Sequence, residues 1–341
     1  MAKKIWSLAI LLLLSFAITT NWHRIPTIAS NNSAQNIERP IVLGYSNWAG
    51  WWPWAIAESE GLFSKHGANV ELRWYDDYTR SMEDLAAGHI DANCQTLNDT
   101  ISFAADAVKG EVVVLINDNS DGNDKIIARA GIDRVEDLRN QQVAVEAGVV
   151  DDFLLTLALE RAGLSRSDVE IVDLETGAAA EAFVAGQVDA VGAFPPFWLT
   201  ALEREGAKEI ASSADFPGAI PDLLVVTEEL VNEYPQQVQA LVNTWFDILN
   251  FMSTQPEKAD QIMAKRAGVS DEEFQQFKAG TKIFTIEDNL EAFKEGNNMI
   301  SMPYAAREIT NFMENNLKST NKPADLTKLF NNSFVTAYVL Q

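Results

Sequence analysis

Residues 86–96 read AAGHIDANCQT and residues 184–194 read VAGQVDAVGAF, so one phrase occurs twice in the chain. Each copy has a glycine that can end a helix, then one polar residue, a β-branched residue and Asp-Ala, followed by a strand-like run. One copy lies in each half of the chain. The repeat predicts two similar lobes, and in each lobe the carboxyl end of this strand is expected to face the cleft between them.

Strand-like and helix-like segments alternate on both sides of the repeat. PIVLGYS (40–46) is typical of a strand, and WAIAESEGLFSKHG (54–67) reads as one helix ended by Gly67. The alternation resumes after residue 118 and continues to about residue 206, and long helical patterns follow LLVVT (223–227). The pattern predicts an α/β protein of two lobes with a helical C-terminal section.

The first nineteen residues, MAKKIWSLAILLLLSFAIT, combine two lysines with an apolar run of about a dozen residues. This run is typical of a secretory signal and is short for a membrane span. We expect export to the periplasm, and a retained signal that tethers the protein to the membrane is the alternative. The predicted division of the chain is a signal peptide at 1–29, a linker at 30–38, a discontinuous first lobe at 39–118 and 223–341, and a second lobe at 119–222.

The charge balance and the missing motifs exclude several classes of protein. The 341 residues carry a formal net charge of -23, which repels nucleic acid and raises the local concentration of small cations, although such charge also keeps an exported protein soluble. The three histidines lack metal-ligand spacing, and no phosphate loop or nucleophile elbow is present. Cys94, the only cysteine, excludes an intrachain disulfide and fits a buried thiol better than a nucleophile. We therefore expect a binding protein with no cofactor and no metal.

Four of the nine tryptophans lie between residues 48 and 54 of GYSNWAGWWPWAIAESEGLF (44–63). Pro53 suits the first turn of a helix, which leaves the three earlier tryptophans in or near the loop after the first strand. We expect Trp54 to lie in the core. The loop tryptophans are candidate ligand-binding residues: Trp48, Trp51 and Trp52.

Residues 44–72, GYSNWAGWWPWAIAESEGLFSKHGANVEL, resemble the opening of the solute-binding proteins of ABC importers for nitrate, sulfonates, taurine and thiamine precursors. The AAGHIDA and VAGQVDA phrases belong to the same pattern. GYSNWAGWWPW, NDNSDGND (117–124) and VAVEAGVVDDFLL (143–155) resemble most closely the branch whose genes neighbour urea carboxylase, an enzyme type associated with guanidine. The resemblance covers about residues 40 to 320. It implies a two-lobed type 2 periplasmic-binding-protein fold, a ligand in the interlobe cleft, a monomer, and permease and ATPase partners.

The residues near the expected cleft favour a cation over an anion. Anion sites use Arg, Lys or a free helix N-terminus, whereas the tryptophan loop has no basic residue and Asp151 and Asp152 begin the helix after the predicted strand QQVAVEA (141–147). Acidic residues occupy predicted strand ends instead. We take four of them as candidate ligands: Asp99, Asp124, Glu146 and Asp222. Four others are expected to be solvated or to cap helices: Asp118, Asp121, Asp151 and Asp152.

Carboxylates beside indole rings suit a small planar cation, because the ring faces attract the charge and the carboxylates accept its N–H groups. We therefore predict that the protein captures guanidinium for an ABC importer. Two alternatives stay open. The same fold can bind urea, an amide, nitrate or a sulfonate, or the chain can be a two-lobed enzyme that acts on a pyrimidine or an amine through Cys94 or His66.

Overall fold

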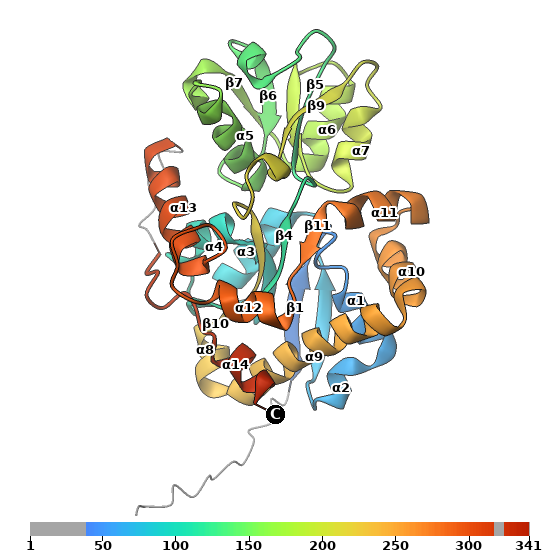
Figure 1. Ribbon diagram of the computed structural model, residues 1–341, viewed down its shortest axis with the longest axis vertical. Coiled ribbons are helices and arrows are strands. Elements are labelled where there is room, and N and C mark those ends of the chain that lie inside the picture. Colours follow the sequence, from blue (N-terminus) through green and yellow to red (C-terminus); the bar gives the residue numbers. More distant parts are fainter. Residues whose placement is uncertain (1–38, 317–323, 341) are drawn as a thin grey trace, which may run out of the picture. The chain divides into compact units, whose positions relative to one another are not determined.

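Two β-sheets, each flanked by helices, form the frame of the protein (Figure 1). The computed structural model describes residues 39–316 and 324–340, so the predicted signal peptide and linker lie outside the described residues. The six-stranded sheet has the order β11-β4-β10-β3-β1-β2, and the five-stranded sheet has the order β7-β6-β8-β5-β9.

The first sheet is mixed, since β1 pairs in parallel with β2 and β3, while β10 runs antiparallel to β3 and β4. Its strands are β1 (Ile41–Tyr45), β2 (Val70–Trp74), β3 (Ala92–Thr96), β4 (Glu111–Ser120), β10 (Pro221–Thr227) and β11 (Thr281–Ile283). The helices that precede β10 in this part of the chain are α1 (Trp54–Glu60), α2 (Leu62–Lys65), α3 (Tyr78–Ala86) and α4 (Leu97–Ala104). Those that follow it are α8 (Glu228–Glu233), α9 (Pro235–Thr254), α10 (Pro256–Ala267), α11 (Asp271–Ala279), α12 (Ile286–Ala292), α13 (Met302–Asn316) and α14 (Ser333–Val339).

The second sheet has a parallel half, β7-β6-β8, and an antiparallel half in which β5 lies between β8 and β9. Its strands are β5 (Lys125–Ala128), β6 (Gln142–Val145), β7 (Glu170–Asp173), β8 (Ala190–Ala193) and β9 (Lys208–Ser212). Its helices are α5 (Val150–Arg161), α6 (Thr176–Val184) and α7 (Phe197–Leu202), with 3₁₀ turns at Val135–Leu138, Arg166–Asp168 and Ser213–Asp215.

The repeated phrase makes the same junction in both sheets. The glycine after α3 and the glycine after α6 have φ values of 73° and 75°, a left-handed conformation that favours glycine. The carboxyl of Asp91 then accepts the N–H of Val42 at 2.9 Å, and that of Asp189 accepts the N–H of Gln142 at 3.0 Å. Each aspartate thereby ties its own strand to the neighbouring parallel strand, so the two copies are equivalent in structure as well as in sequence.

Two adjacent segments carry the chain between the sheets, one leaving β4 and one leading into β10 (Figure 1). The N–H of Ser120 donates to the carbonyl of Ile220 at 2.9 Å, and the hydroxyls of Ser120 and Ser213 lie 2.7 Å apart. These contacts hold the two crossing segments side by side, next to the carboxyl ends of β1 and β8.

Local details confirm some sequence predictions and correct one. Trp54 is fully buried, with its ring stacked on Phe63 at 6.0 Å between centroids, and Cys94 is buried in β3, both as predicted. The single helix predicted over 54–67 is wrong. Gly61 adopts φ 68° and its N–H caps the carbonyl of Ala57, so the segment forms two short helices instead. Within the described part of the chain, no helix has the length and apolar character needed to cross a bilayer.

Candidate functional site

A small cavity of about 10 Å³ lies where the crossing segments meet the carboxyl ends of β1, β3 and β8. The first sheet and its connections line it with Asn47, Trp48, Trp51, Tyr78, Thr96 and Asp222. The crossing segments and the second sheet line it with Asp124, Val150, Phe194 and Ile220. A buried water needs roughly 10–15 Å³, so the cavity is nearly closed as it stands, and even a ligand of a few atoms enters only if its walls move apart.

The last residue of each repeated phrase reaches this cavity. Thr96 ends the first copy and Phe194 ends the second, and they line the space from the two sheets. This placement confirms the prediction that each repeat presents the carboxyl end of its strand to a shared cleft. The repeat was therefore the sequence feature that pointed to these two residues, although neither was named as a candidate.

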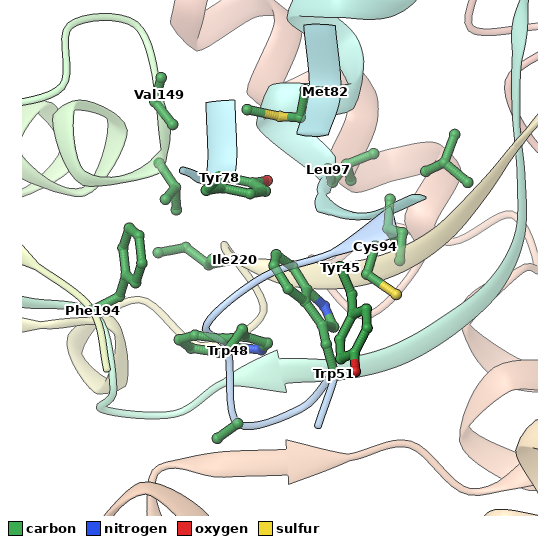
Figure 2. Packing of buried hydrophobic residues seen from close by; sticks show 14 of the residues in the cluster. Tyr45, Trp48, Trp51, Tyr78, Met82, Cys94, Leu97, Val149, Phe194 and Ile220 are labelled. Atoms are coloured by element: carbon green, nitrogen blue, oxygen red, sulfur yellow. The ribbon is translucent and has the colours of Figure 1, made fainter. Parts of the chain in front are cut away.

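Aromatic rings form much of the cavity wall (Figure 2). The ring centroids of Trp48 and Trp51 lie 6.2 Å apart, those of Trp51 and Tyr78 lie 5.3 Å apart, and Tyr78 meets Phe194 edge-on at 6.3 Å. All four side chains are buried. The wall therefore offers π faces from both sheets to whatever occupies the space.

The tryptophan loop is held against a carboxyl from β4. The indole N–H of Trp48 donates to Oδ1 of Asp118 at 2.9 Å. Gly50 passes so close that a Cβ added there would lie 1.8 Å from Oδ2 of the same carboxyl, so only glycine fits at this point. Asp118 thus fixes the position of Trp48.

Three buried carboxyls gather at the cavity. Asp118 and Asp222 are paired across β4 and β10, and Asp222 and Asp124 line the cavity directly. The three residues are 0%, 1% and 3% exposed, in the order Asp118, Asp222, Asp124. Oδ2 of Asp118, Oδ2 of Asp124 and both oxygens of Asp222 accept no hydrogen bond from any other kind of group among the described residues, although the carboxyls of Asp118 and Asp222 can share a proton. The site is therefore rich in buried acceptors.

The same burial disfavours the charged form of these carboxyls. It raises the pKa of Asp118 to about 7 and that of Asp124 to about 6. Burial, followed by repulsion from Asp118 and Asp124, raises the pKa of Asp222 well above its usual range. None of the described residues that line the cavity is basic. A cation bound here would supply the missing counter-charge.

Asp99 lies behind the cavity rather than on its wall. Its carboxyl accepts hydrogen bonds from the hydroxyl of Tyr78 at 3.0 Å, from Oγ1 of Thr96 at 2.7 Å and from Nδ2 of Asn98 at 2.7 Å. The side chain is fully buried, and burial raises its pKa to about 7. Asp99 therefore orients Tyr78, which itself faces the cavity.

Glu146 lies outside this cavity, in an adjoining hollow of about 670 Å³. Its Oε1 accepts a hydrogen bond from Oγ1 of Thr79 at 2.5 Å, which joins α3 to the loop before α5. Consecutive residues separate the two spaces, with Tyr78 and Val150 on the inner side and Thr79 and Val149 on the outer side. The Thr79–Glu146 contact is therefore part of the partition between the cavity and the more open hollow.

Trp52 faces away from the cavity wall. It is fully buried and packs against Phe274 and Phe277 of α11, at 6.0 and 5.8 Å between ring centroids. Phe277 also meets Trp198 of α7 edge-on at 5.2 Å. Of the seven candidate residues, the structure brings Trp48, Trp51, Asp124 and Asp222 together and sets Trp52, Asp99 and Glu146 outside the lining.

The expectation that Asp118 is solvated or capping is wrong. The strand β4 continues through Asp118 to Ser120, so this side chain belongs to a buried strand rather than to a loop. Asp151 and Asp152 are also buried, and neither caps α5. They accept the N–H groups of Glu146 at 2.9 Å and Gly148 at 2.8 Å in the loop before that helix, and Asp152 also accepts from Nε of Arg166 at 2.9 Å. Asp121 is exposed, as expected.

Two further lining residues had weak or no sequence signals. Tyr78 begins α3 soon after the end of β2, a place where parallel strands present residues to a cleft. Ile220 reaches the cavity only because the segment before β10 runs beside β4, and no sequence pattern indicates that pairing.

The groups named for an alternative catalytic role lie elsewhere. Cys94 is buried in β3, and Nε2 of His66 contacts Asp247 of α9 at 2.7 Å. Neither residue lines the cavity. Across residues 39–316 and 324–340, no group of three or more His, Cys, Asp and Glu side chains could hold a metal ion.

The chain is similar to one protein family and to several individual binding proteins. Residues 34–268 match the model of the NMT1-like family. A putative binding protein of Brucella abortus (strain 2308) is 28% identical over 268 residues, which cover 77% of this chain and 82% of the relative. The taurine-binding periplasmic protein of Escherichia coli (strain K12) is 25% identical over 198 residues, covering 57% and 61% respectively.

Solved structures confirm the predicted fold class. The periplasmic aliphatic sulphonate binding protein from Escherichia coli superposes with a TM-score of 0.70 at 19% identity, over 87% of this chain and 93% of that one. The fold is that of type 2 periplasmic binding proteins. A desulfurization enzyme shares it, with a TM-score of 0.61 at 16% identity over 88% of this chain and 99% of that one. The fold alone therefore does not separate binding from catalysis.

Proposed function

Because the chain belongs to the NMT1-like family, we propose that it is the extracytoplasmic substrate-binding subunit of an ABC importer and that its ligand is guanidinium. Similar proteins that bind taurine or sulphonates support a role in capture rather than catalysis. Export would use residues 1–29 as a cleaved signal peptide, and sequencing the N-terminus of the mature protein tests that step. Partners would be a membrane permease and its ATPase.

We infer the ligand from three buried carboxyls, those of Asp118, Asp124 and Asp222. Apart from a proton that Asp118 and Asp222 can share, four of their oxygens have no donor among the described residues. Guanidinium has N–H donors around its whole edge and no acceptor, and it keeps its charge at any pH that proteins tolerate. Each charge-assisted hydrogen bond contributes about 1.5–3 kcal/mol, so two or more of them together offset the cost of ionising one carboxyl whose pKa is raised to about 7, as for Asp118.

The ring wall suits the flat faces of the same ion. Trp48, Trp51 and Tyr78 present indole and phenol rings to the cavity. A cation over such a face gains about 0.5–2 kcal/mol, and more where water is excluded. A planar cation can therefore place its faces against the rings while its edge meets the carboxyls.

Anions fit this site poorly. The N-terminus of α5 is the place where an oxyanion would find free N–H groups, but the first turn of this helix carries the carboxyls of Asp151 and Asp152, which oppose a bound anion. A sulphonate or nitrate in the cavity would also face the carboxyls of Asp124 and Asp222, which repel it when they are ionised. Urea has nearly the shape of guanidinium, yet it is neutral and its oxygen would confront acceptors.

Calorimetry of the purified mature protein against guanidine, urea, nitrate and taurine tests the proposal. We expect one-to-one binding of guanidine and at least tenfold weaker binding of the other three. Binding should strengthen from pH 5 to pH 8, because Asp124 and Asp118, with pKa values of about 6 and 7, must lose protons to hold a cation. Tight binding of taurine or nitrate, or equal affinity for urea, would refute the cation assignment.

A matched pair of variants links the affinity to the cavity. Asp124→Asn removes one cavity carboxylate, whereas Asp121→Asn changes an exposed carboxylate three residues earlier in the same segment. We expect at least tenfold weaker guanidine binding for D124N and unchanged binding for D121N. Equal losses in both variants would indicate a general charge effect and not a direct contact.

A further inference from the structure

We propose that Ile220 limits the ligand to the unsubstituted guanidinium ion and excludes guanidinium compounds that carry an alkyl group on nitrogen. This inference rests on the proposed function and refines its substrate class. It follows from where one aliphatic side chain lies relative to the carboxyl of Asp222.

Ile220 is the bend residue that directly precedes β10, and Asp222 is the second residue of that strand. Both line the cavity, and Ile220 is only 1% exposed. Its backbone is fixed, since its carbonyl accepts the N–H of Ser120 at 2.9 Å. An N–H group directed at Asp222 therefore has the Ile220 side chain as its neighbour.

The surroundings leave this side chain little freedom to move aside. Figure 2 shows Ile220 among the rings of Trp48, Tyr78 and Phe194. Trp48 is tied to Asp118, and Tyr78 is tied to Asp99, so neither ring can shift without breaking a buried hydrogen bond. Closely packed interiors accommodate an added carbon only at a cost. A methyl group on the nitrogen next to Asp222 would need the space that Ile220 occupies.

Ile220 is also the lining residue that best separates size from charge. Its side chain has no polar atom, so shortening it changes the shape of the cavity and leaves every carboxyl in place. Shortening Trp48 or Tyr78 would instead release Asp118 or Asp99 from its partner. Shortening Ile220 therefore changes the size of ligand that the cavity accepts and removes no charged contact.

The test compares guanidine, methylguanidine and ethylguanidine by calorimetry at one pH. The variants are Ile220→Ala, the milder Ile220→Val, and the control Ile127→Ala, which shortens a fully buried isoleucine of β5 outside the cavity lining. For the wild type we expect at least tenfold preference for guanidine over methylguanidine. I220A should reduce that preference at least tenfold, I220V should reduce it less, and I127A should leave it unchanged.

Each outcome has a separate meaning. Equal wild-type affinity for guanidine and methylguanidine overturns the role of Ile220 and leaves the proposed function intact. Wild-type protein that binds no guanidinium compound overturns the proposed function. If I220A does not fold, I220V carries the test, because it removes one methyl group only. An unchanged preference in a folded I220V and I220A pair overturns the inference.

Discussion

Replacing Asp222 with asparagine should stabilise the free protein and weaken ligand binding at the same time. The change keeps the size of the side chain and removes a carboxyl that is paired across the sheet with Asp118 and repelled by it. Residues that serve only the fold show the opposite result, because their loss lowers stability. The combination of the two effects is therefore diagnostic of a carboxyl kept for a ligand.

The magnitude follows from the raised pKa values. A carboxyl whose pKa is about 7 instead of 3.8, such as Asp118, costs about 4 kcal/mol when it ionises in the free protein. The pKa of Asp222 is raised for the same reason and further by its neighbours. The folded state binds the proton of Asp222 more tightly than the unfolded state does. The contribution of this carboxyl to the free energy of unfolding is therefore fully present below about pH 4 and is lost as the pH rises. The asparagine side chain does not incur this loss.

We expect D222N to gain about 2 kcal/mol or more at pH 8, which raises Tm by about 4 °C or more, and to gain almost nothing at pH 4. Guanidine affinity at pH 8 should fall at least tenfold, or about 1.4 kcal/mol. Thermal melts at both pH values and calorimetry at pH 8 measure these effects. Asp91→Asn is the control. Burial raises the pKa of Asp91, but the hydrogen bonds from Arg39 outweigh burial and lower this pKa overall, so the loss of the carboxylate should lower Tm at pH 8. A lower Tm for D222N at pH 8, or unchanged guanidine affinity, would refute the reasoning.

Two further variants test the tryptophan loop and the contact between the cavity and the outer hollow, and a third, Gly67→Ala, is a control. Gly50→Ala should lower guanidine affinity at least tenfold, because its Cβ would displace the Asp118 carboxyl that lies 1.8 Å from it. Gly67→Ala, with φ 72° and open space around it, should lower Tm and leave affinity unchanged. Thr79→Val removes the hydrogen bond to Glu146 between the cavity and the outer hollow, so dissociation of guanidine should accelerate while its association rate stays nearly constant. Stopped-flow tryptophan fluorescence measures both rates, and an unchanged dissociation rate would contradict a gating role for this contact.

Local sequence patterns were enough to predict the two-sheet architecture. The repeated phrase combines a helix end, a glycine at positive φ and a strand, all of which depend on neighbouring residues. The same is true of Trp54, whose place after Pro53 puts it in a helix and so in the core. Even Asp124 and Asp222 could be named, because strand ends in α/β proteins point to the cleft.

Only the tertiary structure decided how the candidate residues divide between cavity, core and partition. Trp48 and Trp52 lie in one loop, yet Trp48 bonds to Asp118 and Trp52 packs on α11, because α11 comes from a distant part of the chain. The strand β4 runs longer than its sequence pattern indicates, and its antiparallel register with β10 places Asp118 opposite Asp222. That register, and the crossing segment that brings Ile220 to the cavity, depend on contacts between residues about a hundred positions apart, which no local pattern records.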